Sequence, residues 1–178
     1  MEEHPPQTSA ADRAGEALCL SCGLCCQGML HARAKLEEEE LGLAEVHGLE
    51  VERFRGQLCF TLPCPKLDQS RCSIYPHRPA ACGSYQCKVL KDLLAGDLTP
   101  EEGQRLVAQA KELVESIRRQ IGSDEASQAV WQQLHAALEQ REAEAPDSEP
   151  TNPLAGAPAP LLLDVAALLA LCRRRFFE

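Results

Sequence analysis

The residues of this chain with the clearest capacity for chemistry are its cysteines. Of the ten, nine lie between residues 19 and 87, and the tenth, Cys172, stands alone. The nine are Cys19, Cys22, Cys25, Cys26, Cys59, Cys64, Cys72, Cys82 and Cys87. Thiolates bind zinc and the iron of iron–sulfur clusters, so this crowding favours metal ligation. Because the ligand groups are separated in sequence, metal binding is predicted to be coupled to folding.

Disulfide bonds are the main alternative use of so many cysteines, and the redox compartment decides between the two. The first eighteen residues are acidic and polar, without the basic start and apolar run of a secretory signal, so we expect a cytoplasmic location. We also expect no membrane span, because the longest apolar stretch, Leu161 to Cys172, is interrupted by Asp164 and is shorter than the roughly 20 residues needed. The sequence therefore predicts metal ligation.

The opening motif, C-x2-C-x2-C-C, has a geometric consequence. Steps of three residues place Cys19, Cys22 and Cys25 on successive helical turns or in a tight knuckle, where their sulfurs can converge. The adjacent Cys25 and Cys26 cannot point the same way. A closed zinc site takes four ligands, so nine cysteines fit either two sites with one spare thiol or a shared polynuclear cluster.

Several other classes of protein are disfavoured. The net charge is −9 and only Arg173 to Arg175 form a basic run, so no nucleic-acid partner is expected. A catalytic cysteine is not expected, because no partner base can be singled out and metal ligation would consume the nucleophile. Whether the chain is an enzyme is left open by the sequence.

The second half of the motif carries a resemblance. It reads Pro63-Cys64-Pro65-Lys66-Leu67, then Cys72-Ser73-Ile74-Tyr75-Pro76-His77-Arg78-Pro79, then Cys82 and Cys87. With the opening motif it resembles the YkgJ-type cysteine-cluster family, whose members are described as chelating zinc or iron and also as containing iron–sulfur clusters. The resemblance covers about residues 19 to 90 and implies that the metal ligands are the following cysteines: Cys19, Cys22, Cys25, Cys26, Cys64, Cys72, Cys82 and Cys87.

Other residues of the motif are weaker candidates. Cys59 is a possible ninth ligand that the family pattern supports less. Gly83 stands where the family commonly has arginine, which puts any role of that arginine in doubt. Arg78, between two prolines, could donate hydrogen bonds to thiolates or be a surface residue. His77 and His31 are expected to be structural or to support the ligands rather than to bind metal.

Two functions remain open. The chain could be a chelating module that holds iron or zinc, with iron, in the form of an iron–sulfur cluster, slightly favoured by the adjacent cysteines. It could instead be an iron–sulfur redox protein or an accessory of a modifying enzyme, because a similar cluster occurs in flagellin lysine methylases. The chain itself has no glycine-rich turn for nucleotide binding. A metal ion is thus the expected partner, and a protein partner could dock on the C-terminal helices.

We expect the chain to be divided into five segments, which together position these cysteines. Residues 1–17 are predicted to be a disordered lead, 18–90 the metal-binding module, 91–142 a helical hairpin packing on it, 143–160 a proline-rich linker and 161–178 a C-terminal helix. The fold class is expected to be mainly α with an irregular cysteine-rich module and few or no β-strands.

The helices are predicted from capping signals and periodicity. Thr99-Pro100-Glu101-Glu102 forms a capping box, and the apolar period that follows ends at Gly122. Leu36 to Val46 is a short helix candidate with an acidic face. The C-terminal helix is expected to fold back on the core, with Cys172 as a buried thiol, in preference to docking on a membrane surface.

Overall fold

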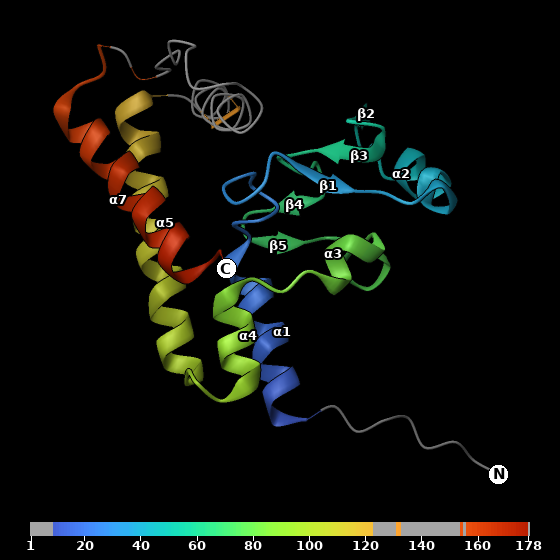
Figure 1. Ribbon diagram of the computed structural model, residues 1–178, viewed down its shortest axis with the longest axis horizontal. Coiled ribbons are helices and arrows are strands. Elements are labelled where there is room, and N and C mark those ends of the chain that lie inside the picture. The colour runs from blue at the N-terminus through green and yellow to red at the C-terminus, as the bar shows by residue number, and fades with distance from the viewer. Residues whose placement is uncertain (1–8, 123–130, 133–153, 155, 178) are drawn as a thin grey trace.

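A computed structural model describes residues 9–122, 131, 132, 154 and 156–177. Most of the described residues are helical, which confirms the mainly α prediction. Figure 1 shows a group of long helices on one side and a set of short strands with small helices on the other. The prediction of few or no strands fits only loosely, because the described part contains two small antiparallel sheets.

Helix α1 (Ala10–Cys22) carries the first two cysteines. It begins with a capping box in which Ser9 Oγ accepts a hydrogen bond from Asp12 N (3.0 Å) and ends at Gly23 with φ +70°. The expectation of a disordered lead through residue 17 is therefore wrong from Ala10 onward, while residues 1–8 lie outside the described part. The helix has few large apolar residues to mark it in the sequence, and Gly15 permits close contact with α4, since a Cβ there would lie 2.9 Å from Leu90 Cδ1.

Helix α5 (Pro100–Ile121) begins where the sequence predicts. Thr99 Oγ1 accepts a hydrogen bond from Glu102 N (3.2 Å), and Glu102 Oε2 accepts one from Thr99 N (2.9 Å). The helix ends at Gly122 in the left-handed conformation. Its buried face comprises Gly103, Val107, Ala110, Val114 and Ile117.

Helix α7 (Ala159–Arg175) packs along α5, as expected for a helix that folds back on the core (Figure 1). Asp164 Oδ2 accepts hydrogen bonds from Ser116 Oγ (2.6 Å) and Gln120 Nε2 (2.7 Å) of α5. Cys172 is buried, as predicted. The shared interior of α1, α4 (Lys88–Ala95), α5 and α7, which we call the helical core, includes Leu18, Leu24, Val89, Leu93, Val107, Ile117, Leu168, Cys172 and Phe176.

Two predicted segments can be followed only in part. The second helix of the hairpin and the linker at 143–160 lie largely outside the described residues. Trp131 is helical and buried in the helical core. Among the described helices, none is both long and apolar enough to cross a bilayer.

The three-stranded sheet has the order β1 (Arg33–Lys35), β3 (Gln57–Thr61), β2 (Val51–Phe54). Between β2 and β3, the two turn residues Arg55 (φ 49°) and Gly56 (φ 81°) are both left-handed, as a tight hairpin turn requires. The predicted helix at 36–46 is divided into a 3-10 turn, η1 (Glu38–Glu40), and α2 (Leu41–Val46). A second buried cluster, the sheet core, forms beneath the sheet from Leu36, Ala44, Leu49, Leu58, Phe60 and Leu62.

The remaining elements of the cysteine-rich part are short. Strands β4 (Leu67–Asp68) and β5 (Arg71–Cys72) form a two-residue hairpin pair. They are followed by a 3-10 turn, η2 (Tyr75–His77), and by α3 (Ala80–Ser84). Strands β1, β4 and β5 have only two or three residues, and β3 is buried at three successive positions, so none of these strands shows the alternating pattern that predicts a strand.

Candidate metal centre

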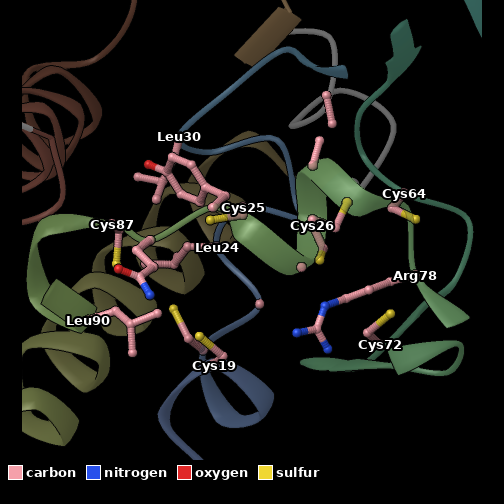
Figure 2. A pocket seen from close by; sticks show the side chains of 18 of the residues that line it. Cys19, Leu24, Cys25, Cys26, Leu30, Cys64, Cys72, Arg78, Cys87 and Leu90 are labelled. Carbon is pink, nitrogen blue, oxygen red and sulfur yellow. The ribbon is translucent and has the colours of Figure 1, made fainter. Parts of the chain in front are cut away.

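Eight of the nine clustered cysteines line one cavity of about 730 Å³. The cavity lies between the ends of α1 and α4 and the short strands, and Figure 2 shows several of the thiols around it. The eight are the ones that the family resemblance implies as ligands: Cys19, Cys22, Cys25, Cys26, Cys64, Cys72, Cys82 and Cys87.

The opening motif is placed by the end of α1 and the turn after it. Cys19 and Cys22 lie in the last turns of the helix, and Gly23 reverses the backbone. In the turn, Gln27 N donates to Gly23 O (2.9 Å) and Gly28 N donates to Cys25 O (3.0 Å). The tight turn brings Cys25 and Cys26 back to the cavity that the helical cysteines line.

Cys64 and Cys72 are held by the backbone of the β4–β5 hairpin. Cys64 N donates to Cys26 O (2.8 Å), which fixes this loop against the opening motif. Leu67 N donates to Cys64 O (3.1 Å), and Leu67 pairs with Cys72 across the hairpin. These contacts bring Cys64 and Cys72 close to Cys26, although both are distant from it in the sequence.

Cys82 and Cys87 lie on α3 and at the N-cap of α4. Glu40 Oε1 accepts a hydrogen bond from Ala80 N (2.7 Å) at the start of α3, so one residue of the acidic run has a structural role. Beside Cys87, Lys88 N donates to Phe176 O (3.1 Å) at the end of α7. Sequence reasoning gave neither Glu40 nor Phe176 a part in the site, because both contacts join distant segments.

Burial raises the pKa values of these thiols. The pKa rises to about 11 for Cys19 and Cys26 and to about 12 for Cys22 and Cys82, with desolvation as the largest cause. Neighbouring thiols raise these four pKa values further, because they would repel a new thiolate. At neutral pH these thiols are protonated, so metal binding must release protons.

Arg78 supplies positive charge at the cavity. Its Nη1 donates to Tyr75 O (2.9 Å), and its Cζ lies 3.6 Å from the centroid of the Tyr75 ring. Its Nε is buried without a hydrogen-bond partner among the described residues. The guanidinium lowers the pKa of Cys19 and Cys26, and Figure 2 shows it close to Cys72. This position agrees with the expectation that Arg78 faces thiolates. It does not agree with the alternative that Arg78 is a surface residue.

The other sequence candidates lie elsewhere. Cys59 is buried in β3, where its Sγ donates to Glu52 O (3.6 Å), and it does not line the cavity. His77 is exposed and also does not line the cavity. His31 borders the cavity, but its ring packs edge-on against Tyr85 (4.8 Å between centroids) and Phe177 (5.9 Å).

The thiols surround the cavity without closing on one point. Among the described residues, no three histidine, cysteine, aspartate or glutamate side chains stand close enough to hold a single ion. The donor set nevertheless fits a thiolate-bound metal, because eight cysteines and the half-buried Arg78 line a common space. A mononuclear ion would require the side chains to move inward, whereas a polynuclear cluster spans a wider gap.

Comparison with known proteins gives one match. Residues 18–115 match the model of the CxxCxxCC family, described as "Putative zinc- or iron-chelating domain". No curated protein matches the chain, and no solved structure does. The matched residues include all eight cysteines of the cavity and most of α5, so the cysteine-rich part is a metal-binding domain for zinc or iron.

Proposed function

Because this chain belongs to the CxxCxxCC family, we propose that it binds iron in iron–sulfur form through the cysteines that line the cavity. The observation that carries the proposal is the number of thiols: eight line one cavity of about 730 Å³. Eight thiolates are twice the number that one tetrahedral ion binds, and cysteine thiolates are the usual ligands of iron–sulfur clusters.

The residues around the cavity would ligate an iron–sulfur cluster, shield it from solvent and offset its negative charge. The eight thiolates would ligate iron, and Arg78 would offset part of their negative charge. Leu24 and Leu90 border the cavity near Cys25 and Cys87, and apolar walls limit solvent access (Figure 2). When bound, an iron–sulfur cluster supplies one-electron redox chemistry.

A closed zinc site is the second candidate. Thiolates suit both metals, and the family description names both. With zinc, the domain would be a structural or storage module without redox chemistry. The high pKa values of Cys22 and Cys82 oppose neither metal, because either one would displace the protons.

Purification of the full chain without oxygen tests the proposal. We expect a brown protein with visible absorption, iron and acid-labile sulfide. The double variant Cys59→Ser/Cys172→Ser is the matched control, because both cysteines are buried away from the cavity, and it should keep the metal content of the wild type. Stoichiometric zinc with neither iron nor sulfide would reject the iron–sulfur proposal and favour the zinc module.

A further inference from the structure

We propose that the cavity holds two separate metal centres, each with four thiolate ligands. This inference rests on the proposed metal-binding function and adds the number of centres and the ligands of each. The helical centre comprises Cys19, Cys22, Cys25 and Cys87. The strand-side centre comprises Cys26, Cys64, Cys72 and Cys82.

The two groups are embedded in different parts of the fold. Ligands of the helical centre come from α1, the turn after it and the N-cap of α4, and three of them pack against the helical core: Cys22, Cys25 and Cys87. Those of the strand-side centre come from loops, β5 and α3, and two of them, Cys64 and Cys82, pack against the sheet core. None of these five cysteines packs against both described cores.

The adjacent pair Cys25 and Cys26 divides between the groups. Cys25 packs against the helical core, whereas the backbone of Cys26 is joined to Cys64 by the 2.8 Å hydrogen bond. In Figure 2, Cys25 lies toward Leu24, and Cys26 lies toward Cys64. Because they are adjacent in sequence, the side chains of Cys25 and Cys26 must point in different directions. The fold gives each of them a different set of neighbours.

Arg78 lies near Cys19 of the helical centre and Cys26 of the strand-side centre (Figure 2). A cation there would reduce repulsion between two anionic centres.

The ligand count completes the argument. Four thiolates saturate a tetrahedral zinc ion and also a cluster of four irons and four sulfides. Each group therefore supplies a full set, and neither centre needs to share a ligand with the other. Cys59, in β3 and outside the cavity, is the spare thiol.

Paired substitutions test the division. The variants Cys22→Ser/Cys87→Ser and Cys64→Ser/Cys82→Ser each remove two ligands from one group only. After purification without oxygen, iron, zinc and sulfide per folded chain are measured by elemental and colorimetric analysis. We expect each variant to keep half of the metal of the wild type, and the two pairs combined to keep none. Loss of all metal from a folded paired variant would show one shared cluster and overturn the inference.

Metal loading of the wild-type chain gives an answer even if a paired variant does not fold. Native mass spectrometry during reconstitution should show a half-loaded species before the fully loaded one. A single loading step, with no half-loaded species, would contradict two centres. This outcome can be distinguished from that of the proposed function. Two zinc ions per chain would reject the iron–sulfur proposal but support two centres. One iron–sulfur cluster per chain would support the iron–sulfur proposal but reject two centres.

Discussion

The surroundings of single side chains distinguish the candidate ligands from the other cysteines. Cys59 and Cys72 are both on strands of the same domain, yet Cys72 borders the cavity and Cys59 Sγ faces the carbonyl oxygen of Glu52. Cys172 is buried among the apolar side chains of the helical core. Burial of a thiol therefore does not distinguish a candidate metal ligand from the other cysteines of this chain. The presence of other thiols around the same cavity does.

Arg78 offers a test of how charge supports the cavity. Arg78→Gln removes the cation that lies beside Cys19 and Cys26, so we expect metal affinity to fall roughly 10- to 100-fold, the range typical for residues that support metal ligands. Arg78→Lys keeps the charge but loses the planar contact with Tyr75 and should have a smaller effect. Competition with a chromogenic chelator measures the affinity.

Arg105→Gln is the matched control, because Arg105 is exposed on α5 and does not line the cavity. It should leave the affinity unchanged. An equal loss in both variants would mean that the net charge of the chain, and not the position of Arg78, governs binding.

The turn after α1 sets the direction of the cysteines that follow it. Gly23 has φ +70°, and a Cβ there would lie 3.0 Å from Ser70 O in the β4–β5 loop. A non-glycine residue in this conformation costs roughly 1–2 kcal/mol, and the backbone contact adds to that cost. The opening motif is thus fitted against the hairpin that carries Cys72.

Gly23→Ala is therefore expected to lower both stability and metal content. Gly56→Ala is the control, because Gly56 also has a positive φ (+81°), but apart from Gly56 and its two chain neighbours no atom of the described residues lies within 4 Å of the position that a Cβ would take there. It should cost roughly 1 kcal/mol and leave metal binding intact. Denaturant unfolding and elemental analysis measure the two effects, and equal metal content in both variants would contradict the role given to Gly23.

Considered as a whole, the molecule has two cores that differ in how much they depend on metal. The helical core is built from long helices that pack along one another, with α7 against α5. The sheet core is small, and the strands that cover it have three to five residues. The β4–β5 pair beside it has only two strands of two residues each, and such a hairpin is marginally stable by itself, so the strand-side part should depend more on its metal.

Treatment with a chelator should reveal this difference in hydrogen exchange. We expect the amides of β3, β5 and α3 to lose protection strongly, whereas those in the middle of α5 and α7 lose little, because helix packing holds them. Mass spectrometry of peptides with and without chelator makes the comparison. Equal loss across all of these elements, or unchanged protection of the strands, would contradict the prediction.

Features that depend on local chemistry could be predicted from the sequence. The cysteine spacing predicted a metal-binding domain, and the family match over residues 18–115 bears out metal chelation. The Thr99 capping box, the stop at Gly122 and the packing of the C-terminal helix were also predicted correctly, because capping and periodicity are encoded within a few turns of chain.

Features that depend on contacts between distant segments emerged only from the folded chain. The fold places eight cysteines around one cavity and leaves Cys59 outside, a division that the family resemblance implied but that spacing and residue type by themselves did not give. It also packs Gly15 of α1 closely against Leu90 of α4 and pairs β1 with β3 across more than twenty residues of sequence, whereas the start of α1 at Ala10 follows from the local capping box at Ser9. Only long-range packing sets such neighbours, since a residue's type and spacing do not specify which distant backbone will lie beside it.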